Sequence, residues 1–143
     1  IGRLIDMGVE PYLVASVLEG ALAQRLGRRI CGDCKKQVPL SDDLSHRLTS
    51  SERALFSSGM WIGEGCDKCN NSGFKGRVGF FELVVVNAEL RAAISDNRSA
   101  SILNSCLSDT HITMRQDAFE KAAVGITTIS EVLRATQDTD IDY

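Results

Sequence analysis

The sequence predicts an α+β fold that is predominantly α, with a zinc-stapled tetracysteine lobe and a C-terminal bundle of short helices. Three observations support this prediction: two C-x-x-C pairs 31 residues apart, one run of aromatic and β-branched residues at 80–86, and a series of helix-capping residues after it. A chain of 143 residues with 43% hydrophobic content can bury one modest core or two small ones.

Residues 11–26 are expected to form a mostly buried helix. Pro11 stands at a tolerated first-turn position. Apolar residues then recur at every fourth position: Val14, Leu18, Leu22 and Leu26. Arg28 and Arg29 follow, where cations favour a helix C-terminus. Residues 1–30 are therefore predicted to be a leading helical segment.

Residues 31–79 are predicted to be a tetracysteine lobe with little regular structure. Ser41 and the two aspartates after it predict the start of a short helix that reaches Leu48. A second brief helix at 52–56 is expected after the hydroxyl-rich residues 49–51. The glycine-rich segment from 63 to 79 predicts a loop, so the lobe is expected to hold one strand or a small hairpin.

Four cysteines form the candidate site: Cys31, Cys34, Cys66 and Cys69. Zn²⁺ prefers four such ligands in a tetrahedron, and a C-x-x-C turn supplies two of them with little strain. Because four protein ligands leave no position for an activated water, we expect a structural zinc. A redox dithiol and an iron–sulfur cluster are the alternatives. Neighbouring Lys35, Lys36 and Lys68 are expected to stabilise thiolate charge.

Residues 80–137 are predicted to form a strand at 80–86 followed by short helices. The expected caps are Asn87, Ser99, and two capping boxes, Thr113 with Gln116 and Thr128 with Glu131. Gly125 fits the left-handed residue that ends a helix. Cys106 is expected to be a small core residue and Trp61 a core anchor. The acidic tail, 138–143, is expected to be solvated.

Composition narrows the class of protein. The formal charge of −3 and the pI near 5.4 argue against a nucleic-acid-binding domain. The sequence has neither a signal peptide pattern nor an apolar run of membrane-spanning length. We expect a cytoplasmic protein, and the first residue, Ile1, leads us to expect a natural chain that continues upstream.

Several segments together resemble the C-terminal, zinc-binding region of the ATPases of type II secretion and type IV pilus assembly. They are MGVEPYL, AQRL before the first cysteine pair, CDKCNNSGFKGRVGFFE, and GITTISEVLR. The resemblance implies a hexameric parent on the cytoplasmic side of the inner membrane, in contact with neighbouring subunits and membrane platform proteins. It also implies that ATP and Mg²⁺ bind the full-length parent at motifs upstream. The chain has no G-x-x-x-x-G-K-[ST], so we expect no catalytic or nucleotide-binding residue in it.

The sequence departs from that family's pattern at a few positions. Gly27 replaces the usual Val, His111-Ile112 the usual Gly-Met, and Ala118 a common Gly.

Some residues keep two interpretations. Arg25, Arg28 and Arg29 are surface cations or contacts to a neighbouring subunit or nucleotide. Arg77 with Glu82 is a packing ion pair or a docking element, and His46 and His111 are exposed or capping residues. The alternative functions are an independent zinc-ribbon module that binds nucleic acid or protein, and a thiol redox enzyme.

Overall fold

The computed structural model describes residues 1–136, of which 42% are helical and 23% lie in strands. The α+β class is confirmed, but with this share of strand the fold is not clearly predominantly α. The described residues pack as two compact units: residues 1–23 with 83–112, and residues 24–82 with 113–136. The acidic tail expected at 138–143, with Asp138, Asp140 and Asp142, lies outside the described residues.

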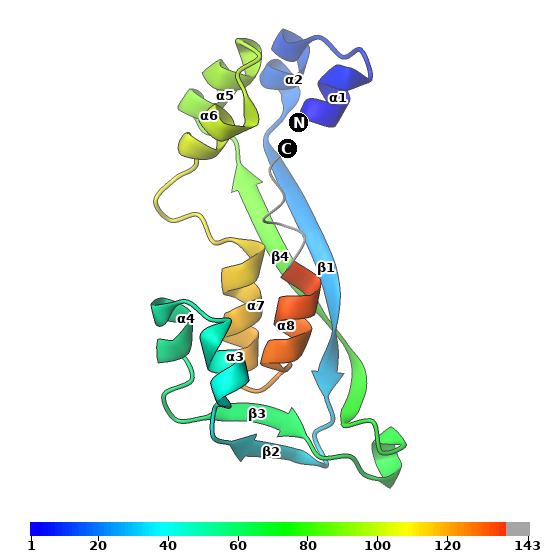
Figure 1. Ribbon diagram of the computed structural model, residues 1–143. Helices are drawn as coiled ribbons and strands as arrows, with labels where there is room; N and C mark the ends of the chain where they lie inside the picture. Colours follow the sequence, from blue (N-terminus) through cyan, green and yellow to red (C-terminus); the bar gives the residue numbers. More distant parts are fainter. Residues whose placement is uncertain (137–143) are drawn as a thin grey trace. The chain divides into compact units, whose positions relative to one another are not determined.

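Four helices make the first unit: α1 (Gly2–Asp6), α2 (Pro11–Val17), α5 (Ala88–Ser95) and α6 (Ala100–Ser105) (Figure 1). Val14, Leu90 and Ile94 are buried in its core. Cys106 lies in the same core, as predicted for a small apolar residue. The predicted cap of α5 is also confirmed, because the Asn87 side chain accepts a hydrogen bond from the Leu90 N–H at 2.7 Å.

The prediction of one long helix at residues 11–26 is wrong. Helix α2 ends at Val17, and strand β1 (Gly20–Ile30) pairs with strand β4 (Phe74–Val85), which runs in the opposite direction in Figure 1. Leu22 and Leu26, whose spacing indicated a buried helical face, are 65% and 47% exposed. Strand pairing with a distant segment has overridden the local helical pattern. Arg28 and Arg29 therefore lie in a strand, not at a helix end.

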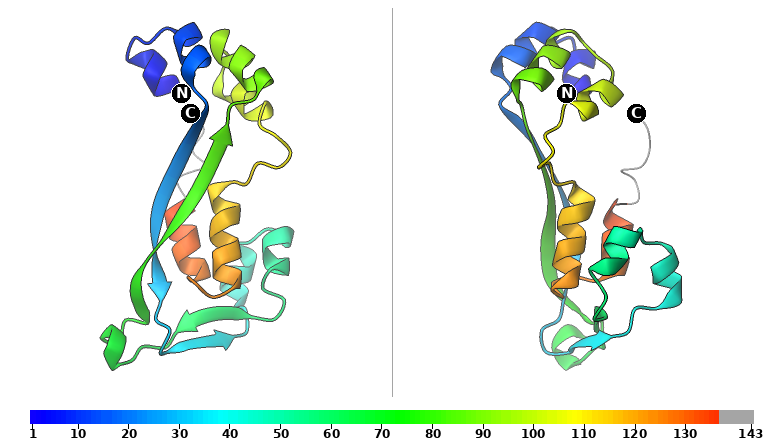
Figure 2. Two further views of the ribbon diagram at one scale, coloured as in Figure 1. Left: turned by 180° about the vertical axis from the view of Figure 1, so that it is seen from behind. Right: turned by 90° about the vertical axis from the view of Figure 1, so that its left-hand side faces the viewer.

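The second unit contains a two-stranded antiparallel sheet where the sequence predicted one strand or a small hairpin. Residues 39–59 separate its two strands, so they do not form a hairpin. Strand β2 (Lys35–Val38) pairs antiparallel with β3 (Met60–Gly63), with Lys35 opposite Gly63 and Val38 opposite Met60. The two predicted helices lie between them in sequence as α3 (Asp42–His46) and α4 (Ser50–Ala54) (Figure 2). Thr49 and Glu52 form a capping box at the start of α4.

Helices α7 (Met114–Ala123) and α8 (Ile129–Thr136) complete the second unit. The predicted capping box of Thr113 with Gln116 is confirmed. Gly125 has a φ of 74° and ends the α7 segment in the left-handed region, as predicted. Both helices pack on a core that includes Phe80, Ala118, Phe119 and Val132.

Two further findings concern Glu82 of strand β4 and the search for a membrane-spanning helix. The Glu82 carboxylate of β4 accepts a hydrogen bond from the Met114 N–H at 2.8 Å, which connects this strand to the start of α7. Within residues 1–136, no helix combines the length and the apolar character that crossing a membrane requires.

Candidate metal centre

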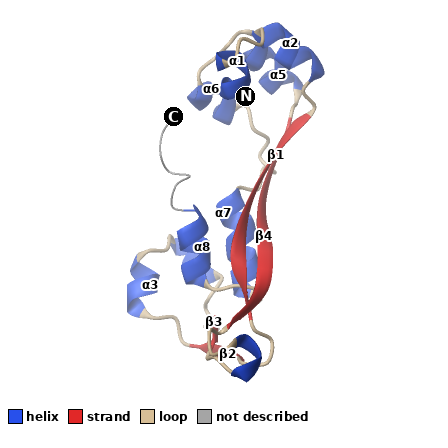
Figure 3. Ribbon diagram, turned by 90° about the vertical axis from the view of Figure 1, so that its right-hand side faces the viewer, coloured by secondary structure: helices blue, strands red, loops and turns tan. Residues whose placement is uncertain are grey.

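The four predicted ligands converge in the second unit. Cys31 and Cys34 lie in the connection from β1 to β2, and Cys66 and Cys69 lie in the connection from β3 to β4 (Figure 3). The second pair is carried by the 3₁₀ turn η1 (Asp67–Cys69). The site therefore joins two two-stranded sheets, whereas the sequence had placed it at the end of a helix.

Distances between the sulfur atoms fit a tetrahedral metal site. The Sγ atoms of Cys31 and Cys66 are 3.9 Å apart, those of Cys34 and Cys69 are 3.8 Å apart, and those of Cys66 and Cys69 are 3.7 Å apart. All four lie within 4.8 Å of one another. A tetrahedron with zinc–sulfur distances of about 2.3 Å has edges of about 3.8 Å, whereas disulfide sulfurs lie about 2.05 Å apart. The thiols are thus positioned to hold a metal ion.

Backbone N–H groups point at two of these sulfur atoms. Gly65 donates to Cys34 Sγ at 3.3 Å, and Cys66 and Gly73 donate to Cys69 Sγ at 3.2 and 3.3 Å. Burial raises the pKa of Cys34 to about 12. Burial also raises the pKa of Cys69, but the two N–H groups outweigh it and lower that pKa to about 6. Hydrogen bonds from Cys66 and Cys34 also lower the pKa of Cys69, so the site favours the thiolate form at this sulfur and the thiol form at Cys34.

Tight backbone contacts hold the two cysteine pairs together. A Cβ built on Gly63 would lie 2.0 Å from the Gly73 carbonyl oxygen, and one on Gly73 would lie 2.4 Å from the Gly63 oxygen. The Cys31 N–H donates to the Gly73 carbonyl at 2.9 Å. Only glycine permits this approach, so the glycines around the second pair shape the site.

Two of the three lysines beside the cysteines, Lys36 and Lys68, contact carboxylates. Lys68 pairs with Asp33 at 2.7 Å, and Lys36 pairs with Glu64 at 2.7 Å. The hydrogen bond from Lys68 lowers the pKa of Asp33, and the same bond raises the pKa of Lys68. These exposed pairs bracket the site from outside, where ion pairs contribute little to stability.

Arg25 and Arg28, two of the three arginines with two possible roles, connect β1 to α8. Arg25 donates to the Ala135 carbonyl at 2.7 Å, and the Arg28 backbone N–H and guanidinium both donate to the Glu131 carboxylate at 2.8 Å. Arg134 also donates to Glu131, which is 1% exposed. Sequence reasoning had read Glu131 only as a capping residue, because its partner Arg28 lies 103 positions away.

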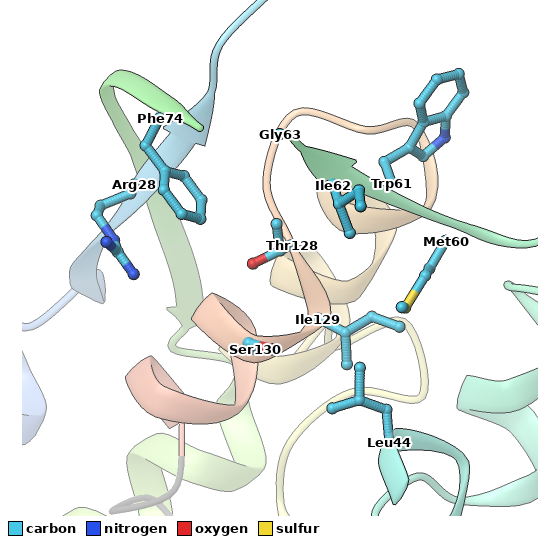
Figure 4. A pocket seen from close by; sticks show the side chains of 10 residues that line it. All are labelled: Arg28, Leu44, Met60, Trp61, Ile62, Gly63, Phe74, Thr128, Ile129 and Ser130. Atoms are coloured by element: carbon cyan, nitrogen blue, oxygen red, sulfur yellow. The ribbon is translucent and has the colours of Figure 1, made fainter. Parts of the chain in front are cut away.

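A hollow of about 300 Å³ lies between β3 and the start of α8 (Figure 4). The side chains of Met60, Ile62, Ile129 and Leu44 line one end. At the other end, the Arg28 guanidinium lies 4.1 Å from the centre of the Phe74 ring. The hollow is mainly apolar, and the cation at its edge is already bound to Glu131.

These features describe an α+β chain in which four cysteines, carried in the connections between two two-stranded sheets, are positioned to hold a metal ion. The chain belongs to the family of type II/IV secretion system proteins, whose family model matches residues 1–134. The predicted resemblance is thus confirmed.

Three relatives illustrate the match. The chain is 37% identical over 139 residues to type II secretion system protein E of Dickeya dadantii, and the matched region covers 96% of this chain and 27% of the relative. It is 40% identical over 137 residues to the type IV pilus assembly ATPase PilB of Thermus thermophilus, and this match covers 95% of this chain and 15% of the relative. It is 35% identical over 139 residues to type II secretion system ATPase E of Vibrio cholerae, covering 97% and 27%. The chain therefore spans 27% or less of the length of these relatives.

Proposed function

We propose that this chain is the C-terminal structural and regulatory part of a hexameric ATPase that powers type II secretion or type IV pilus assembly. Its family membership and the ATPase names of two relatives support the proposal. The chain lacks the glycine-rich loop that cradles phosphates. Nucleotide hydrolysis is accordingly assigned to the longer parent, and no catalytic residue to this chain.

We propose further that the metal is zinc and that it is structural. The tetrahedral spacing of the four sulfur atoms is the observation that carries this proposal. When bound, zinc with four thiolates has no open position for water, so it cross-links backbone and does not activate a nucleophile. We propose that the chain divides by function into the end of the ATPase core (1–30), a zinc lobe (31–79) and a C-terminal region (80–137).

The partners proposed for the parent are its neighbouring subunits and platform proteins of the inner membrane. In this arrangement the protein is cytoplasmic and peripheral to that membrane. The zinc lobe then serves as a rigid surface, because its two cysteine pairs fix loops that would otherwise move independently.

Paired cysteine variants of the full-length parent test this function. Cys69→Ser removes one ligand, whereas Cys106→Ser changes a buried cysteine that lies in the other compact unit. We expect Cys69→Ser to lower zinc content, ATP turnover and hexamer formation measured by ultracentrifugation, and Cys106→Ser to leave zinc content unchanged. Equal zinc content and equal turnover in the two variants would refute the structural role.

The isolated chain provides a second test. We expect no ATP binding by calorimetry and no salt-dependent binding to DNA or RNA by fluorescence anisotropy. Salt-dependent nucleic-acid binding by the zinc-loaded chain would instead favour an independent zinc-ribbon module.

A further inference from the structure

Residues 123–128, which connect α7 to α8, contact three strands near the cysteines: β1, β2 and β3. We call this segment the α7–α8 turn. It contains no metal ligand, and it lies more than 50 residues from Cys69 in sequence. Its contacts with β1, β2 and β3 are all within the second compact unit.

The β2–β3 sheet contacts the α7–α8 turn through Lys35 of β2 and Trp61 of β3. Lys35 Nζ donates to the Val124 carbonyl at 3.1 Å and lies 4.3 Å from the centre of the Trp61 ring. The indole Nε1–H of Trp61 donates to the Ala123 carbonyl at 3.2 Å. A Cβ built on Gly125 would lie 2.4 Å from Lys35 Cε and 2.6 Å from Trp61 Cγ, so the turn packs directly on both side chains.

Strand β1 holds the other half of the turn. The Ile30 N–H donates to the Ile126 carbonyl at 2.9 Å, and the Thr127 hydroxyl donates to the Arg28 carbonyl at 2.8 Å. Thr127 is fully buried. Ile30 precedes Cys31 and Lys35 follows Cys34, so the turn grips the chain on both sides of the first cysteine pair.

We propose that the α7–α8 turn acts as a lock of the metal centre, by which we mean that it keeps the first cysteine pair in the geometry that binds metal. A bound metal then stabilises the α7–α8 turn in this conformation. The inference rests on the proposed zinc site. Two sites coupled in this way influence each other by the same factor, because linkage is reciprocal. Metal occupancy is thereby transmitted to the first turn of α8, where Glu131 binds Arg28.

Zinc release from the 143-residue chain to a chromophoric chelator tests the lock. Thr127→Val removes the hydroxyl that bonds β1, and Thr136→Val makes the same change at an equally buried threonine outside the turn. Lys35→Ala and Gln37→Ala form a second pair on β2, since Lys35 bonds the turn whereas Gln37 bonds the Ser58 carbonyl. Coupling between two linked sites typically changes binding by about 5- to 150-fold.

We expect Thr127→Val and Lys35→Ala to accelerate zinc release about tenfold, and the two controls to stay within about twofold of wild type. The reciprocal measurement is hydrogen exchange at Gly125 and Ile126, whose N–H groups bond the end of α7. Stripping the zinc should accelerate their exchange by a similar factor.

The outcomes separate the inference from the proposed function. If the wild-type chain binds no zinc, both fail. If it binds zinc but each lock variant releases the metal at the rate of its control, or exchange at the turn is unchanged on stripping, the lock alone is overturned.

Discussion

Gly27 of β1 lies directly against the ring of Phe80 in β4: a Cβ built on Gly27 would fall 2.5 Å from Cζ and 2.6 Å from Cε2. Phe80 is fully buried in the core of the second unit. The missing side chain at residue 27 therefore makes the space that the aromatic ring occupies.

Gly27→Val is expected to destabilise the chain by about 1–3 kcal/mol, because overpacking forces the Phe80 ring out of place. Phe80→Leu in the same chain should restore part of that loss, since the smaller side chain leaves room for Val. Urea unfolding of both single variants and the double variant measures the coupling. Strictly additive losses would show that the two positions do not share one space.

Glu131 is expected to make stability depend on acid pH. Burial raises its pKa, but hydrogen bonds from Arg134 and Arg28 outweigh burial and lower it from 4.5 to about 2. The unfolded chain therefore binds this proton more readily, so the stabilisation is present above about pH 4.5 and is lost as the pH falls towards 2.

Glu131→Gln should remove that component and lower stability at neutral pH by about 1–3 kcal/mol, the cost of disrupting a charged buried hydrogen bond. Urea unfolding between pH 7 and pH 3, in the variant and in wild type, gives the comparison. A variant with the same slope of stability against pH as wild type would contradict this assignment.

Two glycines near the second cysteine pair provide a matched comparison. Gly73 and Gly76 both have positive φ, 76° and 83°, but only Gly73 faces another backbone, at Gly63. Gly76→Ala should cost about 1 kcal/mol from backbone strain alone. Gly73→Ala should cost more and also weaken zinc binding, as read by competition with a chelator. Equal effects of the two variants on zinc affinity would argue against the close Gly63–Gly73 contact.

Removal of the metal should loosen the second unit and leave the first intact. All four ligands lie in the second unit, whereas the core around Val14, Leu90 and Ile94 belongs to the first. Hydrogen exchange after chelation should therefore accelerate in β2 and β3 and remain slow at Leu90 and Ile94. Uniform acceleration across both cores would mean that the metal stabilises the entire chain.

Local chemistry explains which elements were predictable from sequence. The C-x-x-C spacing, the caps at Asn87 and Thr113, and the left-handed Gly125 each depend on residues within a few positions of one another. The glycine-rich segment 63–79 also indicated a loop around Cys66 and Cys69, but its second part, from Phe74, lies in strand β4.

The missed features depend on partners distant in sequence. Strand β1 was mistaken for helix because its partner, β4, begins at Phe74, more than 40 residues after β1 ends. Glu131 and Arg28 meet across 103 positions, so no local pattern indicated their ion pair. The contact of Gly125 with Trp61 and Lys35 also joins residues distant in sequence, because it forms only when the β2–β3 sheet and the α7–α8 turn pack together.

Elemental analysis of the reduced chain, purified without chelators, tests the central claim most directly. We expect a single zinc ion per chain, lost on substitution of Cys31, Cys34, Cys66 or Cys69 and retained in Cys106→Ser. A folded wild-type chain that contains no zinc and acquires none on titration would contradict it.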